Sequence, residues 1–204
     1  MAEILPFTAR GTRPLLRAAQ QRRQLVRIWR DGMERGSFCG YVGAVGREFV
    51  LMWVLGDHLD WDGMLALRLR DITEVEAPDK HAGFLEKALR LKRIEPRWPS
   101  TFALDDAVGV VASAVREADI VGVHVDGEAE SEICYIGQVL DVDDDGFNMQ
   151  EVSPDAEWLN EPSWFGWDEL SSISFHDPYA EALLQVAGAP PPLAGDGDSD
   201  CRMR

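Results

Sequence analysis

Cysteine and long apolar runs are scarce in this sequence. Its three cysteines, Cys39, Cys134 and Cys201, do not make an even set for a disulfide framework, so we expect reduced thiols in a cytoplasmic compartment. The longest apolar run covers residues 49–55, far less than the roughly 20 residues of a membrane-spanning helix. The N-terminal residues lack a basic segment followed by an apolar one, so we expect no secretory signal. These absences predict a cytoplasmic protein without a membrane partner.

The motifs of common enzymes and metal sites are also missing. The sequence has no H-E-x-x-H or C-x-x-C spacing to indicate zinc, and no G-x-S-x-G around a serine such as Ser163. His58 lies near Asp60 and could assist acid–base chemistry, although a polar loop explains the same residues. Cys39 and Cys134 are interpreted as small buried side chains, with a redox pair as the alternative. We expect no enzymatic activity, no cofactor and no bound metal.

One segment resembles the start of a calcium loop. Asp141, Asp143, Asp145 and Gly146 follow the D-x-D-x-D-G pattern. A calcium loop needs a bidentate Glu at its twelfth position, where this sequence has Val152, and it needs flanking helices in place of strand-like segments. The pattern therefore favours an acidic hairpin tip over a calcium site.

Basic residues are almost absent from the second half of the chain. Residues 1–98 contain 17 Lys and Arg against 13 Asp and Glu, a balance of +4. Residues 99–204 contain 3 against 23, a balance of −20, which gives the net charge of −16. The second half should therefore repel phosphate backbones. It could attract a basic partner or the first half of the chain, or it could serve solubility alone.

What the sequence does contain is an internal similarity. Residues 38–75 resemble residues 133–173, with Gly43 matching Gly137, Phe49 matching Phe147, and Val75 matching Ile173 at the end. A spacing of roughly 95 residues is too long for solenoid repeats of about 20–50 residues, so we interpret it as a duplicated small domain. The predicted organisation is a lead-in, a first repeat, a linker, a second repeat and a disordered tail, covering residues 1–12, 13–94, 95–101, 102–187 and 188–204.

Apolar periodicity and turn residues predict the same elements in both repeats. The first repeat should contain a helix at 13–24, strands at 26–28, 38–45, 48–55, 64–69 and 72–75, and a helix at 84–91. The second should contain a helix at 104–115, strands at 120–125, 133–142, 147–152, 164–167 and 173–175, and a helix at 179–186. The expected fold class is α+β, mainly β. Each repeat would be a helix, a small bent five-stranded antiparallel barrel-like sheet, SH3-like or Sm-like, and a closing helix.

The first repeat also resembles a group of uncharacterised bacterial proteins built from tandem repeats. The residues that carry the resemblance are Val26-Arg27-Ile28, Gly40-Tyr41-Val42, Phe49-Val50-Leu51, Asp62-Gly63, Leu69-Arg70-Asp71-Ile72 and Phe84. It covers residues 14–91 well. The second copy departs from it, because Trp164-Phe165-Gly166 replaces the Asp-Gly region and Leu170 replaces the isoleucine. The resemblance implies the barrel fold and implies no activity.

An aromatic and acidic segment is the candidate binding site. Trp164 and Trp167 cannot both point inward from a regular strand, because side chains alternate between its two faces. We therefore predict exposed aromatic residues rimmed by acids, which would suit a basic protein partner. Core and loop packing is the alternative. The candidate residues are Trp158, Trp164, Phe165, Trp167, Asp155, Glu157 and Glu161.

Two kinds of function remain open from the sequence. The first is a non-enzymatic binding protein, such as an acidic interaction module or an immunity-like protein that neutralises a basic nuclease. The second is a nucleic-acid-binding protein that uses the basic first helix and the strand after it. The residues that would carry the second function are Arg17, Arg22, Arg23, Arg27 and Arg30.

Overall fold

The computed structural model describes residues 9–34, 36–126 and 133–191. The first half of the chain contains α1 (Ala9–Arg22), β1 (Leu25–Trp29), β2 (Ser37–Val45), β3 (Phe49–Leu55), β4 (Trp61–Arg68), η1 (Leu69–Asp71), β5 (Glu74–Glu76) and α2 (Ala82–Lys92). The second half contains α3 (Ala107–Glu117), β6 (Val121–Val125), β7 (Tyr135–Val142), β8 (Gly146–Glu151), β9 (Ser163–Gly166), β10 (Leu170–Phe175) and α4 (Pro178–Ala187). The protein is thus α+β and mainly β.

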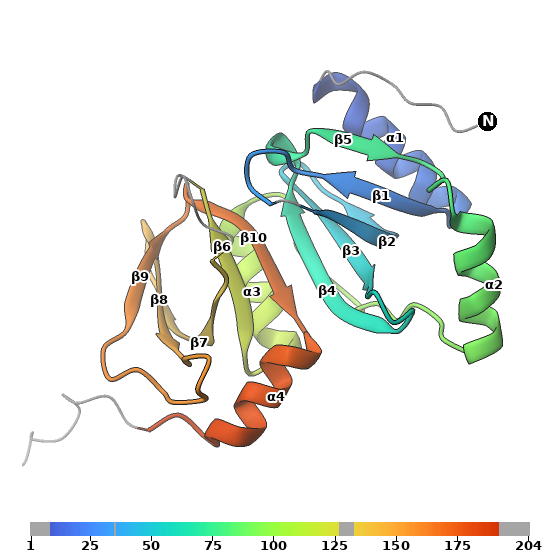
Figure 1. Cartoon of the computed structure of the whole chain (residues 1–204). Coiled ribbons are helices and arrows are strands. Elements are labelled where there is room, and N and C mark those ends of the chain that lie inside the picture. Colours follow the sequence, from blue (N-terminus) through green and yellow to red (C-terminus); the bar gives the residue numbers. More distant parts are fainter. Residues whose placement is uncertain (1–8, 35, 127–132, 192–204) are drawn as a thin grey trace, which may run out of the picture.

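All ten strands belong to one antiparallel sheet in the order β5-β1-β2-β3-β4-β10-β6-β7-β8-β9. The two halves lie side by side, and β4 and β10 meet between them (Figure 1). At this seam Leu67 pairs with Ser172 and Ala66 with Ile173. The sheet is open, with β5 and β9 at its edges. The expectation of two separate five-stranded barrels is therefore wrong, because β4 of the first half pairs side by side with β10 of the second in one open sheet.

The central strand β3 explains the longest apolar run of the sequence. All seven of its side chains are buried, because both faces of the sheet are covered at this point. Phe49 and Leu51 contribute to the larger core, which also contains Phe147 and Ile173 from the second half. The intervening residues, such as Val50, belong to a second core on the other face. One apolar core is thus shared by the two halves.

Helix α1 covers the second core with Leu16 and Ala19, both buried. The helix begins at Ala9, so the predicted lead-in of residues 1–12 is wrong for its last four residues, and residues 1–8 lie outside the described part. Pro14 is therefore inside the helix, at its sixth residue. Proline removes its own backbone bond to the carbonyl four residues earlier but leaves the preceding turn free to form. A proline this near a helix start does not fix the first residue.

The linker and tail predictions fall partly on described residues. Residues 93–106 connect α2 to α3 without a helix or strand. Residues 188–191 likewise have no regular structure, while residues 192–204 of the predicted tail, with Cys201, lie outside the described residues. No helix within the described ranges is long and apolar enough to cross a membrane.

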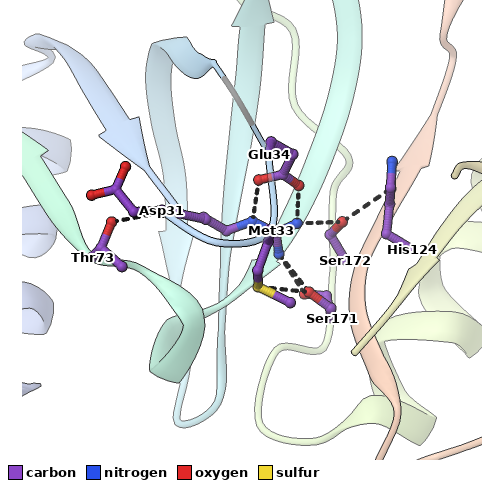
Figure 2. A network of polar contacts seen from close by, with 8 residues as sticks. Asp31, Met33, Glu34, Thr73, His124, Ser171 and Ser172 are labelled. Atoms are coloured by element: carbon purple, nitrogen blue, oxygen red, sulfur yellow. Dashed lines mark hydrogen bonds and ion pairs between the residues drawn. The ribbon is translucent and has the colours of Figure 1, made fainter. Parts of the chain in front are cut away.

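A buried polar network crosses the seam (Figure 2). Arg30 follows β1, is 1% exposed, and forms an ion pair with Glu34 through two of its guanidinium nitrogens. It also donates to the hydroxyl of Ser171 at 2.7 Å and to that of Ser172 at 3.4 Å, both on β10. The Ser172 hydroxyl lies 3.3 Å from Nδ1 of His124 on β6. This network ties the end of β1 to the second half.

Candidate functional site

The turn between β7 and β8 explains the calcium-like sequence pattern. Oδ1 of Asp143 accepts hydrogen bonds from the backbone N–H groups of Asp145 at 2.8 Å and Gly146 at 2.7 Å. These bonds hold the pKa of the Asp143 carboxyl below its ordinary value. Oδ1 of Asp141 accepts a bond from the amide of Asn148 at 2.9 Å. Within the described ranges no cluster of three or more His, Cys, Asp or Glu could hold a metal ion, and these two carboxylates form parts of the hairpin.

Trp164 on β9 lies against this hairpin. It is opposite Asn148 in the ladder, so it shares one face of the sheet with Asn148 and Asp141. Its indole packs so closely on Gly146 that a Cβ at that position would lie 2.8 Å from the ring. The Trp164 side chain also lies near enough to the Asp143 carboxylate to contribute to lowering the pKa of that group. Trp164 thus packs against the turn although 51% of its surface is exposed.

The hairpin beside Trp164 carries exposed apolar and acidic side chains. Leu140 is 37% exposed and Val142 is 54% exposed. Val142 pairs with Phe147, so its side chain lies on the face of the sheet opposite to Trp164. The acidic side chains of the turn are all exposed. We call this surface the acidic tip and define it as Leu140, Asp141, Val142, Asp143, Asp144, Asp145 and Trp164.

The structure divides the aromatic residues that the sequence grouped together. Phe165 is 5% exposed and stacks on Phe147, so it belongs to the core and is not a binding residue. Trp167 is half-buried against Phe147 and donates its indole N–H to the carbonyl of Asp143 at 3.2 Å. Only Trp164 of these three presents a large exposed surface.

Trp158 lies at the other end of β9. It packs against the small core under α4, and its indole N–H donates to the carbonyl of Gly188 at 3.0 Å. Asp155, Glu157 and Glu161 are exposed in the same loop, which precedes Ser163 at the start of β9. The acidic tip adjoins the opposite end of that strand, where Gly146 pairs with Gly166. The predicted acidic rim therefore does not surround Trp164.

Sequence reasoning assigned no partner-binding role to the turn itself. Asp141, Asp143 and Asp145 were weighed as calcium ligands, and an acidic hairpin tip was favoured; their neighbour in space, Trp164, is about twenty residues away in the chain and was not joined to them. A predicted pairing of the two strands, in which Gly166 lies beside Gly146, would have placed Trp164 next to this turn.

Two of the five arginines proposed for nucleic acid are neutralised inside the protein. Nε of Arg27 lies 2.7 Å from Oδ2 of Asp79, and Arg30 is buried with Glu34. Arg17, Arg22 and Arg23 are exposed. The predicted basic surface is reduced to these three residues.

The contacts of Asp60, Cys39 and Cys134 are those of structural residues. Asp60 lies 3.0 Å from the amino group of Lys92, so its contact is an ion pair with α2. Burial raises the pKa of the Cys39 thiol to about 11 and that of Cys134 to about 12. Both thiols are free and remain protonated near neutral pH, which disfavours a nucleophilic role.

Comparisons of this chain with protein-family models, with curated proteins and with solved structures gave no match. The resemblance to tandem-repeat bacterial proteins therefore stays a prediction, and the function must be argued from the site alone.

Proposed function

We propose that this chain is a non-enzymatic binding protein whose acidic tip recognises a basic protein partner. The observation that carries the proposal is Trp164, which is half-exposed yet packed closely on the backbone of Gly146. A fixed aromatic side chain loses little conformational entropy when a partner covers it, which is a property of binding hot spots.

The charge of the tip determines the kind of partner. The turn beside Trp164 carries four exposed aspartates, and residues 99–204 carry 23 acidic and 3 basic residues. This field repels nucleic acid and accelerates the approach of a basic protein. β9 is also an edge of the sheet, although both backbone groups of Gly166 already bond to Glu169 in the following turn.

The experiment measures binding of basic and acidic peptides of matched length to the full chain by surface plasmon resonance. Trp164→Ala should weaken binding of the basic peptides about thirtyfold, the effect of removing an anchor worth about 2 kcal/mol. Trp61→Ala is the matched control, because Trp61 is 36% exposed and lies in the first half. Equal losses in both variants, or preference for the acidic peptides, would refute the proposal.

The charges of the tip can be tested in the same assay. Asp144→Asn with Asp145→Asn should lower the association rate, whereas Asp155→Asn with Glu157→Gln, at the other end of β9, should change it less. Added salt should reduce the rate for wild type and have a smaller effect on the tip variant. Salt-sensitive binding of single-stranded RNA that is lost on changing Arg17 and Arg22 would instead favour the nucleic-acid alternative.

We also propose that the two halves derive from one duplicated unit. The support is that the strand order is fifth, first, second, third, fourth in each half, β5-β1-β2-β3-β4 and β10-β6-β7-β8-β9. Gly40 lies opposite Val54 as Gly137 lies opposite Glu151, and each glycine approaches a partner-strand carbonyl closely. This register matches Gly40, rather than Gly43, to Gly137.

A further inference from the structure

A cleft of about 520 Å³ lies beside the seam and brings together four arginines in this otherwise acidic protein. Its walls come from α1, the β2–β3 turn, the end of β4 with η1, the start of α3 and the β9–β10 turn. Its volume is within the range of small-ligand sites, roughly 300–1,000 Å³. The arginines are Arg13, Arg47, Arg68 and Arg70.

Arg68 carries a charge that no contacting carboxylate neutralises. It is 5% exposed, and its guanidinium donates to the carbonyl oxygens of Asp168 at 2.8 Å and Trp167 at 2.9 Å. Among the described residues, no Asp or Glu forms an ion pair with it, although the charges of Asp71, Asp126 and Glu48 are near enough to influence its pKa. A buried charge bonded only to neutral carbonyls is costly, and an anion in the cleft would offset that cost.

Arg13 provides a hydrogen-bond donor without an acceptor. Its Nη2 atom donates to the carbonyl of Arg47, while its Nε atom is buried and has no partner within the described part of the chain. Buried donors in folded proteins almost always have an acceptor. The unpaired Nε–H therefore points to a ligand with acceptor oxygens.

The other two arginines are more exposed. The side chain of Arg47 is 67% exposed, lies 3.8 Å from the Glu48 carboxylate and donates from Nε to the carbonyl of Asp105 at 3.2 Å. The side chain of Arg70 is 61% exposed, makes contacts of 3.6 and 3.7 Å with Asp71 and Asp126, and donates to the carbonyl of Asp168 at 3.2 Å. The ion-pair contacts are long and therefore weak, so a multiply charged anion would compete for these guanidinium groups.

Helix α3 adds positive potential at the same place. Asp106 caps the helix by accepting from the N–H of Gly109 at 2.8 Å. Ala107 and Val108 line the cleft, and the first N–H groups of a helix have no partner within it. The arginines and the N-terminus of α3 thus both contribute positive potential to this cleft.

We propose that this cleft binds a small multiply charged anion through Arg13, Arg47 and Arg68, at a site separate from the acidic tip. The carboxylates of Glu48, Asp106 and Asp168 also line it. They disfavour a long nucleic-acid strand and leave room for a compact ligand. Phosphate and carboxylate groups share the required chemistry, because both present several oxygens to guanidinium groups.

The test is calorimetric titration of the full chain at low ionic strength with pyrophosphate, inorganic phosphate and citrate, each used separately. Pyrophosphate should bind with millimolar affinity or better. Tighter binding of pyrophosphate than of citrate assigns the site to phosphate-bearing ligands, and the reverse order assigns it to polycarboxylates. No binding of any of the three at about 10 mM would overturn the proposal.

Two variants locate the site. Arg13→Ala should weaken pyrophosphate binding about tenfold or more, the effect of losing a charge-assisted hydrogen bond. Arg17→Ala, one turn further along the same helix and exposed, should leave it unchanged. Arg47→Ala provides a second test at an exposed position in case the first variant folds poorly. Trp164→Ala should not alter pyrophosphate binding, and unchanged affinity in both cleft variants would refute the assignment.

Discussion

Arg30 and Ser171 are 141 residues apart in sequence, yet the guanidinium of one donates a 2.7 Å hydrogen bond to the hydroxyl of the other. The first residue follows β1 and the second lies on β10, so the bond joins the two halves beside the β4–β10 seam. The contact helps to explain why the halves form one sheet. It also uses an arginine that sequence reasoning had assigned to nucleic acid.

Arg30→Ala should destabilise the whole protein by about 3–5 kcal/mol, because it removes one partner of a buried ion pair and leaves Glu34 mostly buried. Urea unfolding measured by fluorescence provides the free energy. Ser171→Ala, which removes one hydroxyl from the same network, should cost only about 1 kcal/mol. If Arg30→Ala lowers the free energy of unfolding by less than about 1 kcal/mol, the network does not stabilise the seam.

His124 should make stability depend on pH. Burial lowers its pKa, and the positive charge of Arg30 lowers it further, relative to the ordinary value of 6.5. In the window just below pH 6.5 the unfolded chain binds more protons than the folded one, so the free energy of unfolding decreases as pH falls through that window to the folded pKa. The measurement is the urea midpoint at pH 7.5 and pH 5.5. His124→Gln should have a smaller difference between the two pH values, and an equal difference would contradict the assignment.

Gly40 and Gly137 should both resist substitution. A Cβ at Gly40 would lie 2.0 Å from the carbonyl oxygen of Trp53, and one at Gly137 would lie 2.2 Å from that of Gln150. Either change to alanine should cost about 2–3 kcal/mol, because strand backbone must move to relieve the clash. Gly83→Ala is the control, since no heavy atom lies within 4 Å of the added carbon in α2. It should stabilise by about 0.4–1 kcal/mol in thermal or urea unfolding.

Much of the local structure follows from the sequence. The Asp143–Gly146 turn and the strands around it were placed within about two residues, because turn residues and side-chain alternation are local signals. The predicted match between Val75 and Ile173 agrees with the strand pairing. Val75 pairs with Ile28 on the first strand of its half, and Ile173 pairs with Val123 on the first strand of the other half. Helix ends were less accurate, since Pro14 suggested a start that the chain does not use.

The seam could not be predicted by the same reasoning. Ala66 and Ile173 are apolar and buried, which fits the interior of two separate barrels as well as one continuous sheet. Whether the strands form two barrels or one sheet depends on which strand edges pair, and the residues near each edge in sequence do not determine that pairing. The site shows the same limit, because Trp158 is held by the carbonyl of Gly188, 30 residues away.

The last prediction separates the binding residue from its neighbour in the core. Trp164 and Phe165 are consecutive on β9 and point to opposite faces of the sheet. Phe165 is 5% exposed, with Phe147 and Tyr135 at ring distances of 5.4 and 5.1 Å. Phe165→Ala should therefore destabilise by about 3–5 kcal/mol, the usual cost of deleting a buried aromatic ring.

Trp164→Ala should cost about 1 kcal/mol or less in the same urea unfolding experiment, because half of the indole is already in water. It should reduce binding of basic peptides while the circular dichroism spectrum is unchanged. A loss of stability as large as that of Phe165→Ala would mean that the indole supports the hairpin through Gly146 and Asp143. In that case the weakened binding would follow from a disordered tip, and Trp164 would not be an anchor for the partner.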